Sequence, residues 1–212
     1  MNIEYHKINS IYKRDLEGKF TNEWAKPEFE YLANNAWDWS EKIDGTNVKI
    51  ILDNTAENPF KIWGKKATSQ PPDFLYNRLV EIFLPIKSAL LNDFKDCPQP
   101  VVFYGEGYGA KIQKGGSNYK KDGVDFILFD VRIGYWWQER ISVENIAKKY
   151  GLNFCRSMGT GTILEAIDYT TKGFNSSFGD FLAEGLVLRP KIDILARNYE
   201  RIITKIKHKD FI

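Results

Sequence analysis

Short stretches in which apolar and polar residues alternate predict β-strands along the chain. A period of two places one set of side chains on a buried face and the other on a polar face. The stretches with strand character are AWDWSE (36–41), TNVKIIL (46–52), FKIWG (60–64), PVVFYGEG (100–107), DFILFDVRI (125–133), AEGLVLRP (183–190) and RIITKIKH (201–208). The first two are joined by a tight corner, KIDG, at residues 42–45.

Helical spacing of apolar residues is clearest between residues 72 and 94. Pro85 lies inside this region and is expected to kink or split the helix. Ser142 is expected to cap a short helix, and Thr162 with Glu165 forms the signature of a capping box. Because the predicted strands outnumber the helices and do not alternate strictly with them, we expect an α+β protein with mainly antiparallel sheets.

Composition narrows the class of protein. The 212 residues are 43% hydrophobic and 15% aromatic, and the net charge is only +2, so a polyanion site would have to be a local patch. Cys97 and Cys155 are too few for a disulfide framework or a zinc site, which indicates a reducing compartment. No apolar run reaches the roughly 18 residues of a membrane span and no signal peptide is evident, so we expect a cytoplasmic protein without a membrane segment.

The corner between the first two strands contains the pattern KxDG, with Lys42 and Asp44. Alone this pattern is weak, because a solvated lysine before an Asp-Gly turn would look the same. Further segments follow it in series along the chain: FYGEG around Glu106, FILFDV around Phe129, AEGLVLRP around Glu184, and TKIKHKDF with Lys205 and Lys207. The series, rather than any one segment, carries the signal.

In this combination the chain resembles the covalent nucleotidyltransferase superfamily of polynucleotide ligases and capping enzymes, and within it the small bacterial and phage RNA ligases. The resemblance implies a ligase adenylation fold of two mainly antiparallel sheets flanked by helices. It also implies that residues 1–212 form a single adenylyltransferase domain without an appended C-terminal domain. The implied activity is ATP-dependent joining of a 5′-phosphate end of RNA to a 3′-hydroxyl, with Mg²⁺ or Mn²⁺.

The chemistry also calls for these residue types. A lysine that attacks a nucleotide phosphate must lose its proton, although a free lysine has a pKa near 10.4. Lys42 is the expected nucleophile. Lys205 and Lys207 stand two apart on a strand and therefore share a face, where both can address one phosphate. Their alternative is an exposed strand face with no function.

Glu106 and Glu184 lie in or beside apolar strands, where an ionised carboxylate needs a partner such as a divalent cation. The resemblance makes Glu184 the metal-handling residue and Glu106 a contact to ribose and metal. It makes Phe129 the ring that stacks on adenine, a position that residue pattern alone would assign to the core. The remaining nucleotide contacts that it implies are Glu41, Asp44, Asn47 and Lys66, the last in place of an arginine common in related ligases.

A basic loop, AKIQKGGSNYKK (110–121), has the composition of a flexible segment that grips a sugar-phosphate backbone or of a plain solvated loop. Its lysines are Lys111, Lys114, Lys120 and Lys121. Three other functions use similar residues: a DNA or mixed-strand ligase, a capping guanylyltransferase, and a nucleotide-binding module without activity. RNA ends are the expected partner, DNA ends are the main alternative, and the oligomeric state stays open.

Overall fold

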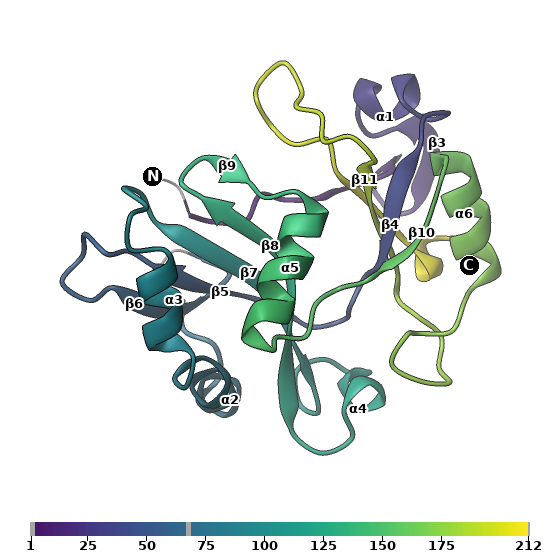
Figure 1. Cartoon of the computed structure of the whole chain (residues 1–212). Helices are drawn as coiled ribbons and strands as arrows, with labels where there is room; N and C mark the ends of the chain where they lie inside the picture. The colour runs from purple at the N-terminus through teal and green to yellow at the C-terminus, as the bar shows by residue number, and fades with distance from the viewer. Residues whose placement is uncertain (1–2, 67–68, 212) are drawn as a thin grey trace. The chain divides into compact units, whose positions relative to one another are not determined.

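A computed structural model describes residues 3–66 and 69–211 (Figure 1). The chain forms two compact units. Unit 1 contains Asp44–Cys155 together with the N-terminal segment up to Tyr5, and unit 2 contains His6–Ile43 and the chain from Arg156 onward. Each unit has its own sheet and its own apolar core.

The sheet of unit 1 has the strand order β6-β5-β7-β8-β9 and is antiparallel throughout its described pairs. Its strands are β5 (Thr46–Leu52), β6 (Phe60–Gly64), β7 (Val101–Gly109), β8 (Val124–Ile133) and β9 (Trp136–Trp137). Strand β5 has the bounds that its alternating pattern predicts. Its register sets Asn47 opposite Glu106 and Lys49 opposite Tyr104 on β7.

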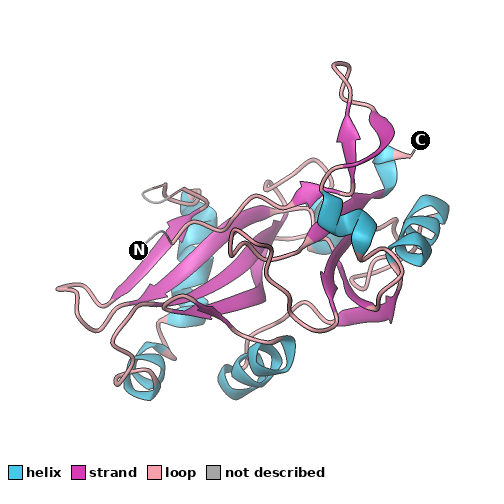
Figure 2. Ribbon diagram, turned by 90° about the horizontal axis from the view of Figure 1, so that it is seen from above, coloured by secondary structure: helices cyan, strands magenta, loops and turns pink. Residues whose placement is uncertain are grey.

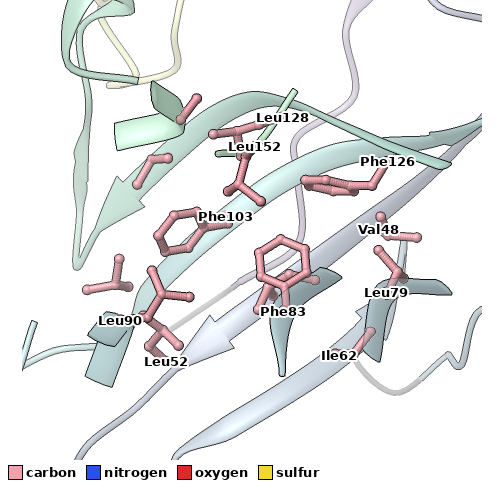
Figure 3. Close-up of a cluster of buried hydrophobic side chains, with 14 of the residues drawn as sticks. Val48, Leu52, Ile62, Leu79, Phe83, Leu90, Phe103, Phe126, Leu128 and Leu152 are labelled. Carbon is pink, nitrogen blue, oxygen red and sulfur yellow. The ribbon is translucent and has the colours of Figure 1, made fainter. Parts of the chain in front are cut away.

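One face of this sheet carries the core of unit 1. Helices α2 (Asp73–Phe83), α3 (Lys87–Asp93) and α5 (Arg140–Tyr150) lie beside its strands (Figure 1). Figure 3 shows Leu79 and Phe83 of α2 gathered with Val48 and Phe126 of the sheet. The rings of Phe83 and Phe126 meet edge to face with their centroids 5.2 Å apart, which adds a specific contact to the buried area.

Two helix boundaries test the sequence predictions. The predicted helix of residues 72–94 is split into α2 and α3 around Pro85, as expected of a residue without an N–H to donate. The prediction that Ser142 caps a helix is wrong, because α5 begins at Arg140 with Glu139 as its N-cap. The preceding segment ends with Gln138 N–H donating to Val131 O, so the chain is already positioned to enter the helix there.

The larger sheet of unit 2 has the order β1-β12-β11-β4-β10. Its strands are β1 (Asn9–Ser10), β4 (Trp37–Glu41), β10 (Ser157–Gly161), β11 (Gly185–Pro190) and β12 (Thr204–Lys207). All neighbours are antiparallel except β1 and β12, which run parallel with Asn9 opposite Thr204 and Ser10 opposite Lys205. Strands β2 (Tyr12–Arg14) and β3 (Phe20–Trp24) form a separate antiparallel pair in the same unit.

The core of unit 2 lies on one face of its larger sheet. It combines Trp37, Leu186, Leu188 and Ile206 with residues of helix α6 (Ile163–Lys172). The capping box predicted for Thr162 and Glu165 is confirmed at the start of α6. The remaining short helices are α1 (Pro27–Tyr31), α4 (Gly116–Tyr119) and the 3₁₀ helix η1 (His208–Asp210).

The predicted class, α+β with mainly antiparallel sheets, is confirmed. Figure 2 distinguishes helices from strands and shows helices packed beside the strands. Across residues 3–66 and 69–211, no helix has the length and apolar character needed to cross a membrane. That the two units together act as one adenylyltransferase domain stays a prediction.

Candidate active site

Glu184 joins two lysines at one end of the unit 2 sheet. Its Oε2 lies 2.6 Å from Lys42 Nζ, and its Oε1 lies 2.6 Å from Lys207 Nζ. The three side chains retain between 13 and 22% of their exposure, so they are shielded but still reachable from solvent. A carboxylate held by two ammonium groups at these distances makes strong, charge-assisted contacts.

Sheet pairing explains why residues so distant in sequence meet. Lys42 directly follows β4, and its backbone N–H donates to Gly185 O at 2.8 Å. Gly185 is in turn opposite Lys207 in the pairing of β11 with β12. Lys42 and Lys207 therefore flank β11 at the residue next to Glu184.

Gly185 is required at this point of β11. Its φ is +152°, which side chains other than glycine rarely adopt, and an added Cβ would lie 2.0 Å from Ile206 O. No rotamer change can relieve a contact with backbone. The glycine thus allows β11 to lie against β12 where Glu184 and Lys207 meet.

Glu41, the residue before Lys42, is only 4% exposed, and its carboxylate is held by a loop that the sequence did not single out. Ser176 Oγ donates to one carboxylate oxygen, while the N–H and Oγ of Ser177 donate to the other at 2.8 and 2.5 Å. These donors satisfy a buried charge that would otherwise be costly. A nucleotide contact of Glu41 stays a prediction. Ser176 and Ser177 carry no motif that would have revealed the contact.

Lys205 lies two residues before Lys207 on β12 and faces the same side of the sheet. Thr204 and Ile206, which alternate with these lysines, are fully buried. The shared face predicted for the two lysines is therefore present. Lys205 is opposite Val187 on one side and Ser10 on the other. Contact of both lysines with one phosphate stays a prediction.

In unit 1, Asn47 and Glu106 form a direct cross-strand pair between β5 and β7. Asn47 Oδ1 is buried and has no hydrogen-bond partner in the described part of the chain. A buried acceptor of this kind suits a ligand that brings a donor or a cation. Gly45 permits the close approach of these strands, because a Cβ there would lie 2.3 Å from Gly107 O.

Phe129 is the extra residue of a β-bulge in β8. Tyr104 pairs with Asp130 and Gly105 with Leu128, so Phe129 has no partner of its own. The bulge changes the alternation: Leu128 and Val131 both face the core, and Phe129 packs in the cluster of Val102 and Tyr104 on the opposite face. The period-two alternation of the strand therefore breaks at Phe129. This break explains why the residue pattern alone assigned Phe129 to the core.

Tyr5 from the N-terminal segment supports this aromatic cluster. Its ring lies edge-on to Phe129 with centroids 5.1 Å apart, and its hydroxyl donates to Asp130 Oδ2 at 2.6 Å. Asp130 is 2% exposed and lies within β8. Tyr5 therefore supplies a donor to a buried carboxylate within the sheet.

Lys66 is exposed in the loop that follows β6, next to residues 67 and 68, which lie outside the described residues. The fully buried Lys49 anchors this loop by donating from Nζ to Lys65 O at 3.0 Å and to Lys66 O at 2.9 Å. Burial lowers the pKa of Lys49, and the charge of Glu4 partly opposes this shift. Whether Lys66 replaces the family's arginine stays a prediction.

The basic loop of residues 110–121 contacts the turn that contains Asp44. Asp44 N–H donates to Tyr119 Oη at 3.3 Å, and Gln113 Nε2 donates to Gly45 O at 3.0 Å. Lys120 forms an ion pair with Asp125 at 2.9 Å. Part of this loop therefore supports the KxDG turn instead of being free for polynucleotide.

The predicted site residues thus form two groups. Unit 2 holds Glu41, Lys42, Glu184, Lys205 and Lys207, and unit 1 holds Asp44, Asn47, Lys66, Glu106 and Phe129. The boundary between the units falls inside the EKIDGTN motif, between Ile43 and Asp44.

A divalent cation is compatible with the oxygen donors of both groups. Within residues 3–66 and 69–211, no cluster of three or more His, Cys, Asp or Glu side chains is arranged as a metal site. Mg²⁺, however, commonly takes one or two carboxylates together with waters and substrate phosphates. In unit 1, Asn47 Oδ1 and the paired Glu106 offer oxygen ligands of this type. In unit 2, Glu184 already lies between the ammonium groups of Lys42 and Lys207. A cation bound to Glu184 would therefore need substrate phosphate to balance this positive charge.

Residues 36–207 match the family model described as RNA ligase. Similar solved structures include a Naegleria gruberi RNA ligase with PPi, with 15% sequence identity and a TM-score of 0.66 over 98% of this chain and 62% of that chain. A lysine-to-alanine mutant of the same enzyme with ATP and Mn gives 15% identity and a TM-score of 0.65, covering 97% and 62% of the two chains. These likenesses establish the shared fold. The present chain spans about three fifths of those chains, and no curated protein sequence matches it significantly.

Proposed function

Because the chain belongs to the RNA ligase family, we propose that it is an ATP-dependent RNA ligase that works through a covalent lysyl-AMP intermediate. AMP passes from this intermediate to a 5′-phosphate end, and a 3′-hydroxyl then displaces AMP to seal the strand. The binding of ATP, AMP, PPi and Mn by the Naegleria gruberi enzyme supports the choice of nucleotide and metal. The observation that carries the proposal is the Lys42–Glu184–Lys207 arrangement.

In the first step, Lys42 Nζ attacks the α-phosphorus of ATP. The new P–N bond forms from the nitrogen electron pair, and the bond to the leaving pyrophosphate breaks with its electron pair on the leaving oxygen. The amine must give up a proton, and Glu184 Oε2, at 2.6 Å, is within reach to accept it. Glu184 thus positions the nucleophile and receives its proton.

Lys207 and Lys205 stabilise the charge on the reacting phosphate. Fixed cations next to a phosphoryl group lower the barrier most where water is partly excluded, as it is beside Glu184. When ATP arrives, its phosphate competes with Glu184 for the ammonium groups of Lys42 and Lys207. The same cations serve the two later steps, since each is an in-line displacement at phosphorus.

The residues of unit 1 supply further nucleotide contacts in this proposal. Phe129 stacks on adenine, Glu106 binds ribose, and Asp44, Asn47 and Lys66 contact the nucleotide or its phosphates. Glu184 and Glu106 are the carboxylates that we propose as ligands for Mg²⁺ or Mn²⁺, which would supply charge neutralisation at the phosphates. Glu41 contributes to the nucleotide site from unit 2, with its carboxylate fixed by Ser176 and Ser177.

Incubation with each of the four α-labelled nucleoside triphosphates tests this function. We expect covalent label from ATP alone, followed by AMP transfer to and sealing of 5′-phosphorylated RNA. DNA ends of the same sequence provide the parallel substrate. Absence of covalent label from ATP would overturn the proposal, and equal sealing of DNA would replace it with a mixed-strand ligase.

A further inference from the structure

A basic pocket lies in unit 2, lined by residues of β12, of η1 and of the N-terminal part of that unit. Its volume is about 540 Å³. Its basic side chains are Lys7, Lys13, Arg14, Lys205, Lys207 and Lys209. Among the described residues that line it, only Asp210 is acidic. For a chain with a net charge of +2, this is a strong local concentration of positive charge.

The sheet topology builds the pocket from the two ends of the chain. Parallel pairing sets Ser10 beside Lys205, and Ile11 N–H donates to Lys205 O at 3.2 Å. Ile11 is fully buried in the unit 2 core, which fixes the path of the segment that carries Lys7 and Lys13. The N-terminal cations are therefore held next to the lysines of β12.

The cations differ in how they are used within the fold. Arg14 pairs with Asp210 at 2.6 Å, and the Asp210 side chain is 5% exposed, so this pair is structural. Lys13 pairs with Glu23 at the surface. Lys7 and Lys209 are exposed and form no ion pair within residues 3–66 and 69–211. Surface pairs are weak, so these three lysines stay available for an anionic ligand.

We propose that this pocket binds the phosphate backbone of the RNA strand next to the reacting phosphate. Cations are distributed over β12, η1, β2 and the segment before β1, which is a wider spread than one phosphate requires. Tyr12 adds an aromatic ring to the lining. A cationic groove with an aromatic surface is typical of single-strand nucleic acid sites. The proposal rests on the function above, because that function places Lys205 and Lys207 at the reacting phosphate.

The test compares two triple variants with the same loss of charge. The pocket variant carries Lys7→Gln, Lys13→Gln and Lys209→Gln. The control carries Lys19→Gln, Lys172→Gln and Lys191→Gln, three exposed lysines of unit 2 that do not line the pocket. Fluorescence anisotropy measures the Kd for a 5′-phosphorylated single-stranded RNA of about 12 nucleotides over a range of salt.

We expect each lost phosphate contact to raise the Kd about fivefold near 0.1 M salt and to lower the salt slope by about 0.7. The control should keep the Kd within about twofold of the original chain, and both variants should form lysyl-AMP at the original rate. The pocket proposal is overturned if the pocket variant binds RNA normally, if the control weakens equally, or if the KM for ATP rises while RNA binding is unchanged. The binding assay contains no ATP, so it judges the pocket even if the ligase proposal fails at adenylation.

Discussion

The Oε2 atom of Glu184 lies 2.6 Å from the Nζ atom of Lys42, although 142 residues separate them in the chain. The contact fixes the rotamer of a side chain that would otherwise be among the most mobile in a protein. It also places a proton acceptor at the proposed nucleophile before any nucleotide binds. The catalytic proposal can therefore be tested by replacing either Lys42 or Glu184.

Lys42→Ala should abolish covalent labelling by ATP, because no other amine is proposed to replace the nucleophile. The fold should persist, since the lysine side chain is partly exposed at the end of a strand. Gel detection of labelled protein measures the first effect and thermal unfolding the second. Lys172→Ala, at an exposed lysine of the same unit, should label normally. Labelling of the Lys42 variant would remove this residue as nucleophile.

Glu184→Gln keeps the shape of the side chain but removes its charge. We expect the rate of lysyl-AMP formation to fall more than tenfold, because loss of an electrostatic contact at a reaction centre typically costs about 3 kcal/mol. Single-turnover labelling measures that rate. Asp168→Asn, at an exposed acid in α6, is the matched control and should have no effect. Equal rates for both variants would contradict the role of Glu184.

Gly185→Ala should destabilise the protein by about 2 kcal/mol or more, since the added methyl group meets Ile206 O at a φ of +152°. Gly179→Ala places its Cβ no closer than 3.7 Å to Phe181 and should cost far less. Chemical denaturation of the two variants measures the difference in the free energy of unfolding. A Gly185 variant as stable as the Gly179 variant would show that β11 can shift away from β12.

Lys49 should make stability depend on alkaline pH. Its pKa is lowered by burial in the folded protein, so between that lowered value and the ordinary 10.5 the unfolded chain binds more protons. The free energy of unfolding therefore rises with pH across this window, by at most about 1.4 kcal/mol per pH unit for one proton. This contribution of Lys49 to the free energy of unfolding is lost as the pH falls through the lowered pKa.

Urea unfolding of the original chain and of Lys49→Met at several values between about pH 7.5 and 10.5 checks this dependence. The original chain should gain stability relative to the variant as the pH rises, because methionine has no proton to release. A constant difference between the two proteins across this range would mean that Lys49 titrates as an exposed lysine does.

The predictable part of the fold came from local patterns that agree with the tertiary structure. Alternation in TNVKIIL gave the bounds of β5, and the missing N–H of Pro85 gave the break between α2 and α3. The bulge at Phe129 was not predictable, because it depends on how β8 pairs with β7. The prediction that Ser142 caps a helix failed for a similar reason, because the preceding segment, and not the Ser142 side chain, determines where α5 begins.

In the candidate site, too, the sequence motifs indicated some residues, whereas the contacts between them depend on the tertiary structure. The motifs indicated Lys42, Glu184 and Lys207, but only the pairing of β4, β11 and β12 places them in contact. The support of Glu41 by Ser176 and Ser177 has no local signature, since two serines in a polar loop are ordinary. Likewise, no spacing rule connects Lys7 or Lys13 with Lys205, because their proximity comes from a parallel strand pair.

That parallel pair sets the order in which the chain can fold during translation. Strand β1 lies at residues 9–10 and its partner β12 at residues 204–207, so the first strand has no neighbour in its sheet until residue 204 and those after it have been made. At about 5–20 residues per second, that interval is roughly 10–40 s. The strands of unit 1, by contrast, are complete by Trp137 and pair mostly with near neighbours in sequence. Unit 1 can thus become structured on the ribosome well before unit 2, in which Lys207 can reach Glu184 only after β12 has been made.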